Sequence, residues 1–370
     1  MKVGILTFHA SHNYGSMLQA YALQQTITGL GHDCEIINFR TDRQRRFYRP
    51  FFINGGLRSK VKAVLYPRIA IDDVRKHRSF ERFLREHLQI SEREYRTAQQ
   101  LSETILPYDA IIAGSDQIWN TSCFDFDRAY FLSFAPSGVR KIAYAPSMGP
   151  EPRIQVLKES DRTICKDLTD FAAVSVRESA TADRIEHITG KRPEITLDPT
   201  LLLSPEQWVA LTPQKRIYEK DYIFLYTPWY NENIYNEAAG LAEKWDMDVV
   251  VTLPESSRYW QKKQNHFKFI TAVGPLEFLN LVKNARIVVS QSFHAVVFSI
   301  MFNRQFYAIN GMDDARISNI LNMLNLQCFA YRPKHSIDQT IVNTQFARAK
   351  EDLKDKIMES LHFLSKSLNA

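Results

Sequence analysis

Short apolar runs alternate along this chain with segments in which apolar residues recur at helical spacing. This pattern predicts alternating strands and helices. Short β-branched runs bounded by polar or glycine-containing turns predict strands buried on both faces of a parallel sheet. Apolar residues at helical spacing lie between these runs. The strands predicted in this way cover residues 3–8, 34–39, 110–113, 140–144, 173–176, 222–226, 248–252, 287–289 and 306–309.

The alternation restarts after residue 200, which predicts two consecutive α/β domains. The segment ITLDPTLLL is followed by SPEQW, a typical helix start, and this marks the boundary. We expect a first domain over 1–200 that carries a basic helical insertion at 40–100, and a second domain over 201–335. A charged amphipathic helix over 336–370 is expected to pack back on the first domain. The predicted fold is α/β, with two Rossmann-like domains facing a central cleft.

The stretch from Ala285 to Arg304 carries the strongest local signal for a site. An apolar strand ends at Ser290-Gln291-Ser292, and an apolar helix follows at once with Ser292 as its N-cap. The start of such a helix is a natural anion site, and His294 in its first turn adds a titratable imidazole. The alternative is that His294 is a buried core histidine bonded to a carbonyl group.

Two further polar turns follow predicted strands of the first domain. Asn13-Tyr14-Gly15 lies after the first strand, where Gly15 either lets backbone approach a ligand or only makes a turn; this is not the dinucleotide fingerprint. Gly114-Ser115-Asp116 follows the strand at 110–113. Ser115 and Asp116 are either ligand contacts at the sheet edge or an ordinary helix cap.

Arg177 follows the strand at 173–176, next to a helix start. Its planar guanidinium suits a carboxylate or phosphate, and the alternative is a structural ion pair with Glu178 or Asp198.

Composition and charge narrow the class of protein. The chain has 370 residues, 45% hydrophobic and 24% charged, which is typical of globular domains. Between residues 40 and 96, 16 Arg and Lys stand against 7 Asp and Glu, whereas the rest of the chain is slightly acidic. This block either binds an anionic surface or forms the solvated face of a helix whose buried side includes Phe80, Phe83 and Leu84. No nucleic-acid-binding signature accompanies it.

The four cysteines are widely separated, with no pattern of metal ligands, and the chain starts with the strand MKVGILTF. We therefore expect a cytoplasmic protein without a structural metal.

Seven segments in order resemble the polysaccharide pyruvyl transferase family. They are TFHASHNYGSMLQAYALQ, AIIAGSDQIWN, KIAYAPSMG, AVSVRES, TLDPTLLL, GPLEFLNLVKNARIVVSQSFHAVVFSIMFNRQFYAI and DDARISNIL. The resemblance implies a bacterial enzyme with a GT-B fold that moves the enolpyruvyl unit of phosphoenolpyruvate onto two hydroxyls of a sugar. That sugar belongs to a surface polysaccharide such as an exopolysaccharide, or to its lipid-linked precursor, and the product is a pyruvate ketal.

The resemblance also implies site residues. His294 and Arg177 correspond to the histidine and arginine of the family's donor pocket. The family's S-F-H-G motif reads SFHA here, and Gln291 replaces a common aspartate. As hypotheses, His294 is a general acid or a clamp for phosphate, Asp116 is the base for a sugar hydroxyl, and Arg316 is a further anion contact.

The chemistry calls for no cofactor or metal, and phosphoenolpyruvate is the donor substrate. The basic segment suggests peripheral contact with the inner face of the membrane. A GT-B glycosyltransferase using a nucleotide sugar is the rival interpretation, with Asp313 or Asp314 as its candidate ribose contact. A binding protein without turnover, descended from the enzyme, is a third.

Overall fold

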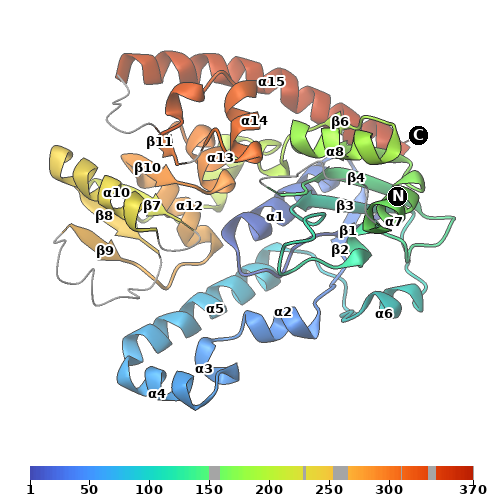
Figure 1. Cartoon of the computed structure of the whole chain (residues 1–370), viewed down its shortest axis with the longest axis horizontal. Coiled ribbons are helices and arrows are strands. Elements are labelled where there is room, and N and C mark those ends of the chain that lie inside the picture. The colour runs from blue at the N-terminus through green and yellow to red at the C-terminus, as the bar shows by residue number, and fades with distance from the viewer. Residues whose placement is uncertain (150–158, 228–230, 253–265, 310, 332–338, 370) are drawn as a thin grey trace.

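In the computed structural model the chain forms two parallel sheets flanked by helices, with a helical arm projecting from the first (Figure 1). The structure describes residues 1–149, 159–227, 231–252, 266–309, 311–331 and 339–369. The boundary expected at 335/336 lies outside these ranges.

The first sheet has six parallel strands in the order β2-β1-β3-β4-β5-β6. Ile111 and Ile112 are both fully buried, and they belong to different core clusters on opposite faces of the sheet. Alternate residues thus fill two cores, as the uninterrupted apolar runs predicted. The strands are β1 (Lys2–Leu6), β2 (Asp33–Ile36), β3 (Ala110–Asp116), β4 (Arg140–Pro146), β5 (Ala173–Val176) and β6 (Glu194–Ile195), the last unpredicted.

Helices of ordinary length connect these strands. Helix α1 begins at Tyr14, within the turn Asn13-Tyr14-Gly15 expected after the first strand. Asn13 is its N-cap and accepts hydrogen bonds from the amides of Gly15 and Ser16. The helices are α1 (Tyr14–Gly29), α6 (Ala98–Ser102), α7 (Glu159–Thr169) and α8 (Ser179–Thr189), with 3-10 turns η1 (Arg128–Phe131) and η2 (Pro199–Leu201).

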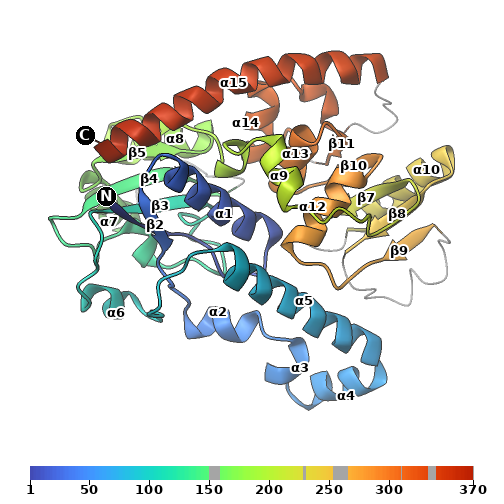
Figure 2. The same cartoon turned by 180° about the vertical axis from the view of Figure 1, so that it is seen from behind.

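The basic insertion is helical, as expected. Between β2 and α6 it forms α2 (Asp42–Phe47), α3 (Phe51–Asn54), α4 (Leu57–Leu65) and α5 (Pro67–His87). Pro50 adds a break that the periodicity did not reveal. Phe80, Phe83 and Leu84 are the buried residues of α5, as predicted. Figures 1 and 2 show α3 and α4 at the free end of this arm.

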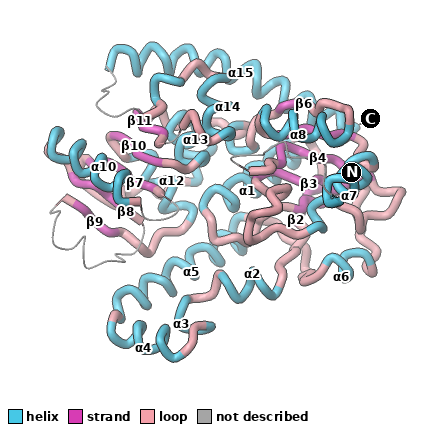
Figure 3. The backbone as a smooth tube through the Cα atoms, viewed as in Figure 1, coloured by secondary structure: helices cyan, strands magenta, loops and turns pink. Residues whose placement is uncertain are grey.

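The second sheet has five parallel strands in the order β11-β10-β7-β8-β9. Its strands are β7 (Tyr222–Tyr226), β8 (Asp248–Val251), β9 (Phe267–Phe269), β10 (Ile287–Ser290) and β11 (Gln305–Ala308). The prediction missed β9. The helices are α9 (Pro205–Leu211), α10 (Glu232–Trp245), α12 (Pro275–Asn284), α13 (Phe293–Met301) and α14 (Ala315–Met323), with the 3-10 turn η3 (Gln327–Phe329). Figure 3 shows the separate strand layers of the two sheets.

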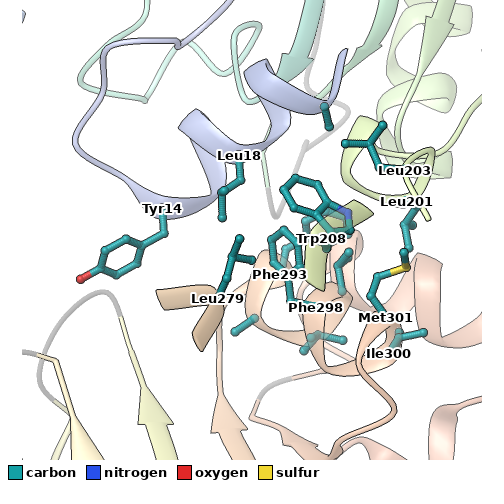
Figure 4. Packing of buried hydrophobic residues seen from close by; sticks show 14 of the residues in the cluster. Tyr14, Leu18, Leu201, Leu203, Trp208, Leu279, Phe293, Phe298, Ile300 and Met301 are labelled. Carbon is teal, nitrogen blue, oxygen red and sulfur yellow. The ribbon is translucent and has the colours of Figure 1, made fainter. Parts of the chain in front are cut away.

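A continuous apolar core joins the two domains. Trp208 of α9 is fully buried, and its ring meets that of Phe298 edge to face at 5.0 Å. On the other side, the ring of Tyr14 from α1 stacks on that of Phe278 from α12 at 4.7 Å. Figure 4 shows residues of α1, α9, α12 and α13 packed together. The first turns of α1 and α13 are therefore held close to each other.

The last helix, α15 (Gln339–Asn369), contacts both domains rather than only the first. Its Phe346 packs on Phe329, with ring centroids 5.2 Å apart. Near its other end, Ser360 accepts a hydrogen bond of 3.0 Å from the amide of Leu197, and Arg140 donates to the carbonyl of Ser367. Among the helices of the described ranges, none combines the length with the apolar character that a membrane crossing requires.

Candidate active site

A cavity of about 650 Å³ lies where elements of both domains meet. Five of the eight predicted site residues line it: Asn13, Asp116, Ser292, His294 and Arg316. Gly15 and Arg177 instead contact lining residues from behind, and Ser115 is buried next to Asp116. The lining also includes Asp125, Asp313 and Asp314, so the cavity combines several carboxylates with few cationic groups.

The strand and helix predicted around His294 form as expected. β10 lies between β7 and β11, and α13 begins directly after Ser292. Ser292 occupies the N-cap position, but its side chain makes no capping hydrogen bond; its amide instead donates to Oγ of Ser290 at 3.0 Å. His294 is 8% exposed in the first turn of the helix and lines the cavity. His294 is therefore buried, as expected of a core histidine, but it also forms part of the cavity wall.

Gly15 is the residue that makes room for this imidazole. A Cβ atom placed on Gly15 would lie 1.9 Å from Nδ1 of His294. The sequence placed Asn13, Tyr14 and Gly15 in a loop, but Tyr14 and Gly15 already belong to α1. Asn13 caps that helix, so its oxygen is engaged. The role of Gly15 is therefore the close approach of two helix starts from different domains.

Arg177 is almost fully buried at the end of β5 and forms ion pairs. Its Nη1 lies 2.9 Å from Asp198, and its Nε lies 3.4 Å from Glu178. Burial disfavours the charged guanidinium, but the carboxylates of Asp198, Glu178 and Asp116 outweigh it and raise the pKa of Arg177. The structural ion pair that the sequence left open is therefore present.

One face of the Arg177 guanidinium contacts a residue of the cavity wall, and one of its nitrogens is left unpaired by the described residues. Its guanidinium lies 4.4 Å from the ring centre of Phe293, a lining residue. Among the described residues, its buried Nη2 has no hydrogen-bond partner.

Asp198 joins the two residues that the sequence singled out most strongly. Its Oδ2 lies 2.9 Å from Arg177 and 3.5 Å from Nε2 of His294, and Thr200 donates to its Oδ1. Burial alone would raise the pKa of Asp198, but His294 and Arg177 together with the Thr200 hydrogen bond lower it. The sequence analysis considered Asp198 only as a possible partner of Arg177. The D-P-T sequence after β6 indicates a turn at Asp198. It cannot show that His294 from the other domain lies beside this turn.

Ser115 and Asp116 lie within β3, so they are neither a turn after the strand nor the cap of a helix. Asp116 has a φ of 72°, which is uncommon for a residue other than glycine. Its carboxylate accepts a hydrogen bond from Ser16 and lies 4.0 Å from Arg177. Ser115 is fully buried and donates to the carbonyl of Ala145. Asp116 therefore faces the cavity, and Ser115 supports the strand behind it.

Arg316 is held by its neighbour. Asp314 is the N-cap of α14 and accepts hydrogen bonds from Nε and Nη2 of Arg316 at 3.0 and 2.6 Å. Both residues line the cavity, so Arg316 contributes its charge there while its geometry is fixed by Asp314.

Asp125 is a cavity residue that the sequence analysis did not identify. Its Oδ2 accepts hydrogen bonds from Ser11 and Tyr48, whereas its Oδ1 is buried without a hydrogen-bond partner among the described residues. Burial raises the pKa of Asp125. Tyr48 comes from the basic insertion, so this arm supplies part of the cavity wall. No local motif marks Asp125, because its partners lie far away in sequence.

A second polar cluster connects the arm to the β1 loop. One ligand atom each of His12, His77 and Glu81 lies within 4.8 Å of the others, a grouping that the sequence spacing did not predict. However, Arg40 donates to both oxygens of Glu81, at 2.8 and 3.3 Å. A guanidinium on the carboxylate opposes a cation at the same place. We interpret this cluster as the anchor of α5.

The fold and this cavity define a two-domain enzyme of the GT-B class, and comparison with known proteins gives the family. The family model for polysaccharide pyruvyl transferase matches residues 13–313. The chain therefore belongs to the polysaccharide pyruvyl transferase family, a family of transferases. No curated protein sequence matched the chain.

Solved structures with the same fold are UDP-N-acetylglucosamine 2-epimerases and related proteins. The *Neisseria meningitidis* 2-epimerase bound to UDP-GlcNAc is 10% identical with a TM-score of 0.53, over 100% of this chain and 99% of that one. *S. aureus* MnaA with UDP is 10% identical with a TM-score of 0.54, over 98% and 90%. A *Listeria monocytogenes* protein described as a putative 2-epimerase is 10% identical with a TM-score of 0.50, over 96% and 90%. At this identity the likeness establishes the GT-B fold alone.

Proposed function

We propose that this enzyme moves the enolpyruvyl unit of phosphoenolpyruvate onto two hydroxyls of one sugar and forms a pyruvate ketal. The acceptor is a surface-polysaccharide sugar or its lipid-linked precursor, met at the inner face of the membrane. The observation that carries the proposal is the buried link from Arg177 through Asp198 to His294, at the wall of a cavity between the two domains. Membership of the family supports it.

The reaction requires a proton at C3 of the donor. Protonation makes C2 cationic, and the first sugar hydroxyl adds there as it loses its proton. The bond from C2 to the phosphate oxygen then breaks, and the second hydroxyl adds to C2 and loses its proton. One hydroxyl proton balances the proton gained by C3, and the other leaves with inorganic phosphate.

His294 is suited to proton transfer in this scheme. Its Nε2 lies 3.5 Å from the Asp198 carboxylate at the cavity wall, and we assign to His294 the proton that goes to C3 or to the leaving phosphate. The start of α13 and the Nη2 atom of Arg177 are the groups we assign to the donor's negative charges. Arg316 adds a third positive group at the cavity.

The carboxylates of the cavity suit the acceptor. Sugar hydroxyls donate well to carboxylate oxygens, and both Asp116 and Asp125, whose buried Oδ1 has no partner among the described residues, line the cavity. Asp116 remains our first candidate for the base, and Asp125 is a second. These groups would repel a polyanionic donor, so we place the donor on the His294 side of the cavity.

A nucleotide-sugar glycosyltransferase is the second candidate. Asp313 and Asp314, the predicted ribose contacts, do line the cavity. However, Asp314 is already paired with Arg316, which leaves Asp313 as the better contact.

The deciding experiment compares donors by thermal unfolding. Phosphoenolpyruvate at about a hundred times its dissociation constant adds roughly 2.7 kcal/mol and raises the melting temperature. We expect this rise in the wild type, its loss in His294→Ala and Arg177→Lys, and its retention in His187→Ala, an exposed histidine on α8. Release of inorganic phosphate with an acceptor panel then tests turnover. A rise only with nucleotide sugars would overturn the proposal.

A further inference from the structure

The free end of the helical arm exposes an unusual amount of apolar surface. Helix α4 has no buried residue. Leu57, Val61, Val64 and Leu65 are exposed by 78, 48, 79 and 67%. Of the 13 large hydrophobic side chains exposed in the described ranges, 8 lie between Phe47 and Ile71. Such a concentration marks an interaction surface, because isolated apolar side chains are ordinarily scattered.

These side chains share one face of α4. Residues 57, 61, 64 and 65 follow the spacing of four, seven and eight that places them on one side of a helix. Arg58 and Lys60 flank this apolar face on its two sides. The neighbouring residues Ile53 and Tyr66 are also exposed, by 53 and 43%, and extend the apolar surface past both ends of the helix.

The charged residues of the segment that carries this face have a single sign. Residues 43–71 contain eight Arg and Lys and no Asp or Glu. Within the described part of the chain, no carboxylate lies at ion-pair distance from Arg58 or Lys60, and Lys62 lies 5.7 Å above the ring of Phe51. The flanking charges are therefore available to an external anionic partner.

We propose that this surface, α4 with Ile53 and Tyr66, binds an anionic lipid bilayer. An apolar helix face lined by Lys and Arg lies in the headgroup region with its apolar side chains inserted and its charges on anionic lipids. A second copy of the chain would bring the same positive charge against it, which opposes self-association. A nucleic acid would leave the apolar face uncovered.

The position of the surface fits a membrane-facing role for the enzyme. Figure 1 shows α4 at the far end of α5, away from both sheets. The base of α5 is anchored beside the cavity, because Phe80 stacks on Tyr14 at 5.3 Å and on His12 at 4.9 Å. Docking through α4 would hold the cavity at a fixed offset from the bilayer. The membrane setting is part of the proposed function, but this surface can be tested without any reaction.

The test is co-sedimentation of the full chain with vesicles of phosphatidylcholine alone or with three parts in ten phosphatidylglycerol. We expect the protein to bind the mixed vesicles and to bind the neutral vesicles much more weakly. Replacing Val61, Val64 and Leu65 together by Ser should weaken binding roughly tenfold or more, and Arg58→Gln with Lys60→Gln should weaken it by a similar factor. Val209→Ser with Met358→Ser, exposed apolar residues elsewhere, should bind as the wild type does.

Because α4 is exposed, the variants should keep the wild-type melting temperature, which checks their fold. Wild-type protein that stays in the supernatant, or an apolar-face variant that binds equally well, would overturn the proposal. The proposal would also be overturned if the wild type did not bind vesicles but formed a dimer that the same three Ser substitutions disrupt. The thermal response to phosphoenolpyruvate should be unchanged in all these variants, so failure of the surface and failure of the proposed reaction are separable.

Discussion

Gly15 and His294, from different domains, are so close that a Cβ atom on Gly15 would lie 1.9 Å from the imidazole Nδ1. The two residues lie in the first turns of α1 and α13, and the core between these helices fixes their approach. The imidazole therefore keeps its place only while position 15 lacks a side chain.

Gly15→Ala is expected to displace His294 from Asp198. Overpacking of this kind costs about 1 to 3 kcal/mol of unfolding free energy. The variant should also lose the rise in melting temperature given by phosphoenolpyruvate. Urea denaturation and thermal unfolding measure the two effects. Gly29→Ala, in the same helix with no atom within 4 Å of an added Cβ, is the control and should stay within about 1 kcal/mol of the wild type. Equal behaviour of the two variants would contradict the argument.

Asp198→Asn is expected to destabilise the protein by about 3 kcal/mol, because it leaves Arg177 buried with a weakened set of partners. Since the folded-state pKa of Asp198 is lowered, the carboxylate stabilises the wild type above its unfolded pKa of about 4, and this contribution is lost as the pH falls. Urea denaturation at pH 7 and at about pH 3 measures both, because the contribution is lost only below the unfolded pKa. The gap between wild type and variant should narrow at the lower pH. Asp183→Asn, which removes an exposed ion pair, should change little.

His9 should make the protein sensitive to mild acid. Burial is the main cause that lowers the pKa of His9 to about 4, and the charge of Arg40 adds to it. The unfolded chain takes up a proton near pH 6.5 whereas the folded chain does not, so stability falls between pH 6.5 and pH 4. The loss due to His9 is about 3 kcal/mol. His9→Gln should remove it. Parallel pH profiles for wild type and His9→Gln would show that another group is responsible.

Asp125→Asn should separate acceptor from donor binding. Asn keeps an acceptor for Ser11 and Tyr48, so the fold and the response to phosphoenolpyruvate should be preserved. Turnover should fall, because the free carboxylate oxygen at the cavity is lost. If Asp125 is the base, its raised pKa places the acidic limb of the wild-type rate above the usual carboxyl range, with activity increasing as pH rises. Steady-state rates across pH test this, and an unchanged acidic limb in the variant would exclude that role.

The local pattern around residues 285–304 predicted its structure well. A β-branched run followed by polar residues and an apolar helix has few other solutions, and β10 and α13 begin and end close to the expected positions. The family resemblance then pointed to His294 and Arg177. The helices of the basic insertion were harder to predict, because Pro50 separates α2 from α3 at a point where the hydrophobic periodicity shows no break.

Asp198 and Asp125 show what the sequence could not supply. Each is defined by partners that are distant in the chain: Asp198 by His294 from the second domain, and Asp125 by Ser11 and Tyr48. Asp125 lies in a segment without periodic or motif signals, and the TLDPTLLL segment around Asp198 does not reveal a partner in the second domain. Only the fold brings these groups together, so their roles emerge from tertiary contacts rather than from spacing.

The path of α15 gives the chain a second crossing between the domains. The chain passes to the second domain through η2 and α9, and α15 returns from Phe346, packed on Phe329, to Ser360, bonded to Leu197. These two covalent crossings add to the apolar contact of Trp208 with Phe298 in joining the domains. Labels near Lys2 and near Ser367 would both report on the first domain, because β1 belongs to the first sheet and Ser367 is bonded to Arg140 of β4.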